Sequence, residues 1–357
     1  MTSQAAQASP DTRDETPATA SGRSIGSLVR RPETGALIGT VGVFIFFAIF
    51  GGKDFVTPGG ASSWLNVAGE LGIIAIPVGL LMISGELDLS VGSVVAASSM
   101  VLAIVSGFWG APVIVGIALA LALGAAVGLI NGVIVTRTRV PSFIVTLATQ
   151  FALAGLTLGF SRLLTSNVSV AIDAGEWGHL LLGQLIGHQF EVAIFWWAIV
   201  VVVVGWIVHV AKFGNWIFAI GGDLESARAA GIPTNRVKVA LYIGTGLGAA
   251  LVGVMETILY NSAQVAKGQS FVFNSIIAVV IGGVLLTGGY GSVFGIVLGT
   301  LTFSIVNQGI YYTGWNADWA SLILGVLLLA AVLMNNTFRK MALSYSPSAP
   351  KAKKGRG

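Results

Sequence analysis

Long apolar stretches separated by short polar segments make up most of the chain. A helix needs about 20 mostly apolar residues to cross the roughly 30 Å of hydrocarbon in a bilayer. Stretches that approach this length lie at approximately residues 35–51, 66–84, 89–107, 112–135, 141–160, 191–210, 238–260, 271–287, 291–311 and 318–335. Several are short or rich in glycine, so any of them could be broken or re-entrant. The pattern predicts an all-α polytopic membrane protein with about ten transmembrane helices.

The composition supports a membrane protein and excludes several other classes. Hydrophobic residues make up 55% of the chain and charged residues 10%, whereas charged residues form about 25% of a typical soluble domain. Such a chain cannot be a cytosolic enzyme, a disordered regulator or a secreted disulfide scaffold. It contains no cysteine, which excludes disulfides, thiolate metal sites and cysteine nucleophiles. We therefore expect no catalytic residue, no metal and no cofactor.

Polar and basic segments flank the apolar region. Residues 1–34 are rich in Ala, Ser and Thr, and we expect a disordered cytoplasmic tail there. Residues 35–335 form the predicted transmembrane domain, and residues 336–357 a basic cytoplasmic tail. Two loops within the domain are long: residues 161–190 on the predicted outer side and residues 211–237 on the inner side.

The placement of lysine and arginine predicts the orientation, because cytoplasmic loops carry an excess of both residues. With the N-terminus inside, all but three of the 19 basic residues fall on the cytoplasmic side. The exceptions are Lys53, Arg162 and Lys267. We therefore expect both termini in the cytoplasm (N-in and C-in). The net charge of +4 then reflects membrane topology, and we expect no nucleic-acid partner.

Two parts of the chain resemble each other. Residues 73–79 (IIAIPVG) match residues 276–282 (IIAVVIG), and Gly92-Ser93-Val94 matches Gly291-Ser292-Val293 after a short offset. Internal repeats are common in transporter folds. The alternative is coincidence between two apolar sequences built from few residue types. The similarity slightly favours an internal duplication, and coincidence stays the alternative.

Glycines recur at four-residue intervals in several apolar stretches. Such spacing places small residues one turn apart on one helix face, where another helix can approach closely. The repeats are Gly124-x3-Gly128-x3-Gly132, Gly155-x3-Gly159, Gly244-x3-Gly248 and Gly291-x3-Gly295-x3-Gly299. They predict a compact helix bundle and carry no information about a substrate.

Charged residues in or near membrane spans are costly and often functional. Here they are Glu70, Glu86, Asp88 and Glu256. A proton- or sodium-coupled carrier would use buried carboxylates of this kind. For the loop that contains Asp88, Ser90 and Gly92 we favour another role, in which Asp88 or Ser90 caps the helix that follows.

Residues 222–233 carry the signals of a short helix in the inner loop. Asp223 suits the N-cap position, and Glu225 in the first turn suits the helix dipole. Leu224, Ala227 and Arg228 fall at helical spacing on one side. Gly231 suits the C′ position, and Pro233 prevents continuation. A helix of about two turns is marginal alone, so we expect it to pack on its own membrane helices or to dock a cytoplasmic partner.

Four motifs in this order resemble the permease subunit of bacterial ribose-type ABC importers. They are Ser84-Gly-Glu-Leu-Asp-Leu-Ser-Val-Gly-Ser93, Asn131-Gly132 with Arg139-Val-Pro-Ser-Phe-Ile-Val-Thr-Leu147, Phe218 to Ile232, and Ala278-Val-Val-Ile-Gly-Gly283 with Gly288-Gly-Tyr-Gly-Ser292. The resemblance covers about residues 60 to 335. Glu86, Asp223 and Tyr290 depart from the residues that the family commonly has at these positions.

The resemblance implies a permease in the bacterial inner membrane that carries a monosaccharide by alternating access. It implies cytoplasmic ATP-binding subunits, a periplasmic sugar-binding protein and a permease homodimer. The rival hypotheses are an ion-coupled secondary transporter and a non-transporting membrane scaffold. Which sugar is carried stays open, as do the residues that bind it. Candidate hydroxyl-binding side chains are Asn66, Gln150, Asn261, Gln264, Asn307 and Gln308.

Overall fold

Helices dominate the computed structural model, which describes residues 32–344. The principal helices are α2 (Pro32–Phe50), α4 (Pro58–Ile83), α5 (Val91–Leu102), α6 (Val113–Arg137), α7 (Ser142–Thr165), α9 (Ala193–Val210), α12 (Thr234–Leu259), α13 (Gln269–Ile281), α14 (Val293–Gly309) and α15 (Trp319–Ser344). In this described part, eight helices are long and apolar enough to cross a membrane, and two more apolar helices are shorter. They lie where the apolar stretches predict them, which confirms the all-α polytopic membrane fold.

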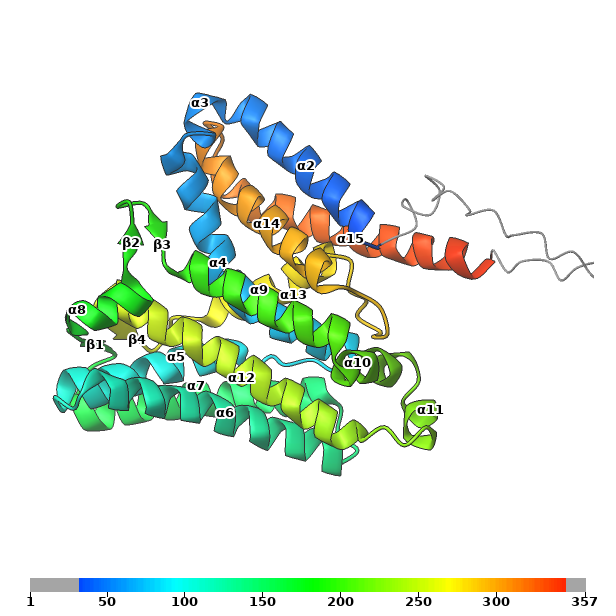
Figure 1. The fold of residues 1–357 in the computed structure, drawn as a ribbon. Coiled ribbons are helices and arrows are strands. Elements are labelled where there is room, and N and C mark those ends of the chain that lie inside the picture. The colour runs from blue at the N-terminus through cyan, green and yellow to red at the C-terminus, as the bar shows by residue number, and fades with distance from the viewer. Residues whose placement is uncertain (1–31, 345–357) are drawn as a thin grey trace, which may run out of the picture.

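Short elements join the long helices at the two ends of the bundle (Figure 1). One end carries α10 (Lys212–Gly222), α11 (Leu224–Ala229) and the loop of residues 282–292. The other end carries α3 (Gly52–Phe55), α8 (Gly175–Gly178), η2 (His179–Gly183) and the strands β1 (Ser169–Ala171), β2 (Leu185–Ile186), β3 (Phe190–Glu191) and β4 (Ser262–Gln264). Because most basic residues of the loops lie at the α10–α11 end, we call it the basic end and the other the opposite end.

Two small antiparallel sheets organise the opposite end. β1 pairs with β4, with Val170 facing Ala263, and β2 pairs with β3, with Leu185 facing Glu191. The predicted outer loop of residues 161–190 is therefore a folded segment. It connects α7 and α9 and is fastened to the turn that follows α12.

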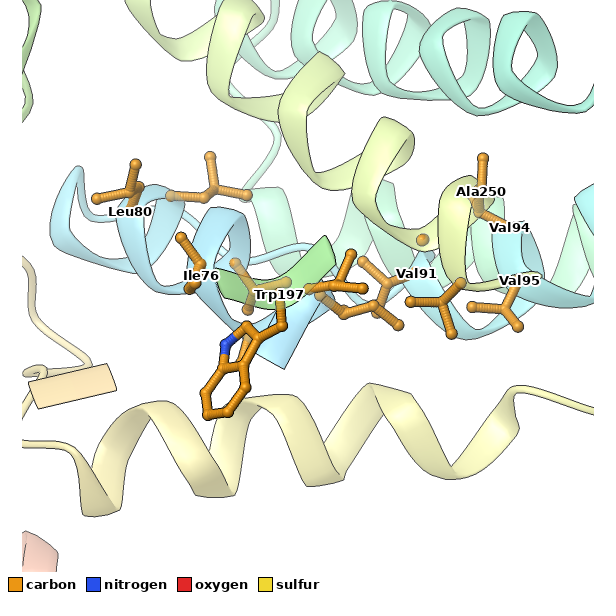
Figure 2. Packing of buried hydrophobic residues seen from close by; sticks show 14 of the residues in the cluster. Ile76, Leu80, Val91, Val94, Val95, Trp197 and Ala250 are labelled. Atoms are coloured by element: carbon orange, nitrogen blue, oxygen red, sulfur yellow. The ribbon is translucent and has the colours of Figure 1, made fainter. Parts of the chain in front are cut away.

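One continuous apolar core holds the central helices together. Figure 2 shows members of this core from α4 (Ile76, Leu80), α5 (Val91, Val94, Val95), α9 (Trp197) and α12 (Ala250). The ring of Trp197 occupies the space that Gly72 leaves free, because a Cβ at Gly72 would collide with the indole. A second cluster around Phe47, Phe55 and Phe303 joins α2 and α14 to the bundle.

The glycine repeat of α6 packs closely against α12, as predicted. A Cβ at Gly128 would overlap the carbonyl oxygen of Tyr242, and a Cβ at Gly132 would lie 2.9 Å from the Cα of Val239. The two backbones therefore approach to a distance that only glycine allows, which favours close helix packing in lipid. The repeat in α7 is different: no atom of the described chain lies within 4 Å of a Cβ built on Gly155 or Gly159. For this pair, the prediction of packing within the chain is wrong.

Helix α13 is shorter than the predicted span at residues 271–287, because it ends at Ile281. It has 13 residues, or about 20 Å at 1.5 Å per residue, against roughly 30 Å of hydrocarbon. The residue before it, Gly268, has φ +97, and a Cβ there would lie 2.6 Å from the carbonyl oxygen of Gly92 and 2.8 Å from the Cβ of Val95 in α5. The helix therefore begins inside the bundle, beside α5.

The predicted tails lie mostly outside the described residues. This holds for residues 1–31 and 345–357. Helix α2 starts at Pro32, and α15 continues to Ser344. The internal duplication stays a prediction. Its two segments, residues 73–79 and 276–282, lie in α4 and at the end of α13, and both helices run toward the basic end.

Candidate functional site

The helix predicted at the basic end is present as α11. Asp223 precedes it in an extended conformation, and its carboxylate accepts a hydrogen bond from the Ser226 amide at 2.9 Å. This bond confirms Asp223 as the N-cap. It also lowers the pKa of Asp223, because the amide stabilises the ionised carboxylate.

The end of α11 is fixed by backbone hydrogen bonds. Gly231 has φ +79, and its amide donates to the carbonyl of Arg228 at 2.9 Å. The amide of Ile232 donates to the carbonyl of Ala227 at 3.1 Å. This pair of bonds is the Schellman arrangement, which requires a left-handed residue at C′. The prediction that Gly231 ends the helix is confirmed.

The two faces of α11 have different surroundings. Ala227 is 3% exposed and belongs to the main core, and Leu224 packs against that core. Glu225 and Arg228 form an ion pair at 3.0 Å with side chains 82% and 48% exposed. The helical spacing predicted that Arg228 lies on the same side as Leu224 and Ala227. This prediction is wrong, because Arg228 is exposed on the other side. One face attaches α11 to the bundle and the other offers a charged surface.

Three glycine-containing segments meet beside α11. The amide of Gly289 donates to the carbonyl of Ile83, the last residue of α4, at 2.8 Å. A Cβ at Gly221 of α10 would collide with that carbonyl and lie 2.5 Å from the Gly289 amide. A Cβ at Gly288 would lie 2.9 Å from the Cα of Gly85. Hence α10, the end of α4 and the 282–292 loop touch backbone to backbone, so a shift of one displaces the others.

The loop of residues 84–90 does not cap α5 as predicted. Ser90 occupies the N-cap position of α5 without a side-chain cap bond. Asp88 Oδ1 accepts from the Ser90 amide at 2.9 Å and from the Ser90 hydroxyl at 2.6 Å. Its Oδ2 accepts from the Thr245 hydroxyl of α12 at 2.5 Å. Burial raises the pKa of Asp88, and the hydroxyl donors oppose this rise. The carboxylate thus links the loop to α12.

The hydrogen-bond network continues from Ser90 into α6 and α7. The Asn131 amide donates to the Ser90 hydroxyl at 2.9 Å, and Thr149 donates to Asn131 Oδ1 at 2.6 Å. Gly92 has a separate role, because it provides space for the turn before α13. Sequence reasoning placed Asp88, Ser90 and Gly92 together, but it missed Asn131 and Thr245 as their partners. The Asn131-Gly132 motif was the one available signal.

The amide-bearing candidates separate in the structure. Asn66 fixes the β2–β3 hairpin, since it donates to the Gln189 carbonyl and accepts from the Glu191 amide, both at 2.9 Å. Asn307 and Gln308 bond to each other at 2.9 Å. Asn261 and Gln264 lie at the opposite end around β4. Only Gln150 joins several helices within the bundle.

The remaining carboxylates do not form a metal site. Glu70, Glu191 and Glu256 come from α4, β3 and α12 near the opposite end, where Lys267 lies 3.6 Å from Glu256. Within residues 32–344, no group of three or more acidic, histidine or cysteine side chains has the arrangement of a metal centre. Glu86 is paired with Lys238 of α12.

A family model described as the permease component of a branched-chain amino acid transport system matches residues 60–332. The chain belongs to this permease family. It is therefore a multi-pass transport protein of the bacterial inner membrane and not an enzyme. The permease's motif at residues 84–93, its α10–α11 segment and its 282–292 loop all fall within the matched region.

Several curated relatives are sugar import permeases. The ribose import permease protein of Escherichia coli K12 is 34% identical over 264 residues, covering 74% of this chain and 81% of the relative. The ribose import permease protein of Bacillus subtilis is 32% identical, covering 83% and 91%. The fructose import permease protein of Rhizobium meliloti is 30% identical, covering 83% of each chain. These matches confirm the resemblance to ribose-type permeases. No solved structure matches the chain.

Proposed function

We propose that this permease carries a monosaccharide of the ribose, fructose or xylose type, and that ATP hydrolysis in a separate subunit drives the transport. The family description mentions amino acids, but the named relatives are ribose and fructose import permeases. The sequence has no GxxxxGK[ST] motif, so it has no obvious means of hydrolysing ATP itself.

The orientation proposed from charge places the basic end in the cytoplasm. That end carries Arg137, Arg139, Lys212 and Arg228, whereas the opposite end carries Lys53, Arg162 and Lys267. Single cysteines test this, since the chain has none of its own. In intact cells, an impermeant thiol reagent should label Glu176→Cys in the outer segment and leave Glu225→Cys unlabelled. The reverse result would invert the topology.

The observation that carries the proposed coupling is the two-faced helix α11. Its inner face is part of the core, and its outer face presents Glu225 and Arg228. We propose that cytoplasmic ATP-binding subunits dock on this outer face. Movement of α11 and α10 then reaches α4 and the 282–292 loop through the backbone contacts at Gly221 and Gly289. The helices switch between outward-open and inward-open states.

Two further partners belong to the same proposal. A periplasmic sugar-binding protein would meet the folded 161–190 segment at the opposite end, and two copies of the permease would form a homodimer in the bilayer. Light scattering of the purified complex measures the copy number. Uptake that depends on an added sugar-binding protein tests the first partner.

An ion-coupled carrier would need carboxylates along a path through the bundle. Instead, Glu86 is paired with Lys238, and Glu70 and Glu256 lie near the opposite end. A scaffold would need no docking helix. In proteoliposomes, uptake should stop with a catalytically inactive ATPase partner and survive collapse of the proton gradient. Uptake that persists with the inactive partner would instead support the carrier.

The docking step is tested by removing the charges from the outer face of α11. Because exposed ion pairs contribute about 0–1 kcal/mol to stability, Glu225→Ala with Arg228→Ala should leave membrane abundance normal. ATPase co-purification and uptake should both fall. The matched control is Glu176→Ala with Arg162→Ala, which removes exposed charges at the opposite end and should leave ATPase binding intact. Equal ATPase binding in both double variants would exclude α11 as the docking surface.

A further inference from the structure

The turn before α13 places the start of this helix against α5. Gly268 lies against Gly92 and Val95 of α5, and the carbonyl of Val95 lies against Gly253 in α12. Helix α13, which starts at Gln269, therefore begins deeper in the bundle than the end of α12 at the opposite end. Irregular backbone at membrane depth is tolerated only where it is buried in protein or lines a water-filled cavity.

A chain of amides fixes Gln269 in this position. Gln150 of α7 accepts from the Ser93 amide at 3.0 Å, and its own Nε2 donates to Gln269 Oε1 at 2.6 Å. The Ser93 hydroxyl donates to the Gln150 carbonyl at 2.6 Å. Ser93 and Gln150 are buried, whereas Gln269 is exposed. With Oε1 engaged, the two N–H donors of Gln269 remain, and no described residue accepts from them.

The surface around this amide combines hydrogen-bond donors with an aromatic ring. Phe273 lies one helical turn after Gln269, on the same face of α13, and is 66% exposed. Ser270 is exposed beside it. Free N–H donors facing lipid would be costly, so this face does not suit contact with acyl chains. An amide that binds hydroxyls, next to a ring that covers the C–H face of a sugar, is suited to a pyranose or furanose.

We propose that Gln269 and Phe273 form a sugar-binding contact on the translocation path, positioned by Gln150 and Ser93. The contact takes a monosaccharide through its hydroxyl groups, and a second copy of the permease closes the water-filled space in front of it. This inference rests on the proposed function, because it requires that the permease carries a sugar across the membrane. It adds the residues that touch the sugar.

Water access distinguishes a sugar path from a lipid-facing surface. A cysteine thiol reacts as its thiolate, which forms in water and not in hydrocarbon. The variants Gln269→Cys and Phe273→Cys are to be treated with a small hydrophilic thiol reagent in proteoliposomes that contain the ATPase partner. Val202→Cys, in the middle of α9 and 69% exposed, is the lipid-facing control. We expect both α13 cysteines to react at least tenfold faster than the control. The transported sugar should slow the reaction of both α13 cysteines.

A transport measurement accompanies the labelling. Gln269→Leu should lower uptake at least tenfold while membrane abundance and ATPase co-purification stay normal. If both α13 cysteines are as unreactive as Val202→Cys, or Gln269→Leu transports like the wild type, the proposed contact is wrong. The proposed function would survive that result, since it fails only if the wild-type protein shows no ATP-driven uptake or no ATPase binding.

Discussion

Lys238 of α12 and Glu86 of the 84–90 loop form an ion pair in which both side chains are almost buried, at 11% and 13% exposed. Two further hydrogen bonds follow on the same helix face. They run from the Tyr242 hydroxyl to the Leu87 carbonyl at 3.3 Å and from Thr245 to Asp88 at 2.5 Å. Residues 86, 87 and 88 of the loop are therefore bound by Lys238, Tyr242 and Thr245, which lie on one face of α12 because they are four and three residues apart. Because α12 starts directly after α11, this attachment links the proposed docking helix to α4 and α5.

Breaking the ion pair from one side should weaken the protein. Lys238→Met leaves the Glu86 carboxylate without its cation, and removing one partner of a buried pair costs roughly 3–5 kcal/mol. We expect a lower unfolding temperature in detergent and reduced uptake. The exchanged pair, Glu86→Lys with Lys238→Glu, should recover much of both. Arg236→Met, an exposed change on the same helix, is the control. A wild-type unfolding temperature for Lys238→Met would refute the attachment.

Neighbouring glycines in α10 offer a second test. A Cβ at Gly221 would collide with the Ile83 carbonyl, whereas a Cβ at Gly222 meets no atom within 4 Å. Gly221→Ala should therefore separate α10 from α4 at a cost of about 1–3 kcal/mol, typical of overpacking, and should reduce uptake. Gly222→Ala should behave like the wild type. Thermal unfolding and uptake of the two variants decide the point, and equal effects would contradict the backbone contact.

Local signals predicted more of this protein than long-range ones. The apolar stretches located the membrane helices because lipid requires about 20 apolar residues per span. Asp223 and Gly231 located α11 because capping depends on neighbours only a few residues away. The side of α11 on which Arg228 lies was not predictable from helical spacing, because tertiary packing decides which side is buried.

Contacts between distant residues could not be read from the pattern. Glu86 looked like a departure from its family, but its partner Lys238 is 152 residues away. Likewise, Gly128 and Gly155 belong to the same kind of repeat. Only the structure shows that Gly128 faces α12 and that Gly155 faces no described residue. The early start of α13 had a local signal, since Gly268, Gln269 and Ser270 precede an apolar run.

The β2–β3 hairpin should respond to pH through Glu191. Burial, and then the Glu256 carboxylate, raise the pKa of Glu191 to about 7, while Lys267 opposes the rise. The docked hairpin therefore binds a proton more tightly than an open one. Docking of the hairpin should be strongest below pH 4.5, the ordinary pKa of a glutamate. It should weaken as the pH rises from 4.5 to about 7, and it should level off above that.

A spin label on Ile186→Cys, at the exposed end of β2, measures this effect as hairpin mobility. Mobility should increase between pH 5 and pH 8. Glu191→Gln should remove the dependence, because it stays neutral among Glu70 of α4, Glu256 of α12, Lys267 and Tyr260. Glu176→Gln, an exposed change in the same segment, should leave it intact. A pH response that survives Glu191→Gln must come from another group.

The two glycine repeats should respond differently to the same substitution. Leucine at Gly128 would push α6 away from the Tyr242 carbonyl of α12, in the most closely packed part of the bundle. Overpacking of this kind costs about 1–3 kcal/mol and sometimes more, so Gly128→Leu should lower the unfolding temperature and the membrane abundance. Gly155→Leu points into space that no described residue occupies, and the isolated permease should tolerate it. If Gly155→Leu is equally damaging, the uncovered face of α7 must pack against another chain, and the change in copy number measured by light scattering would show it.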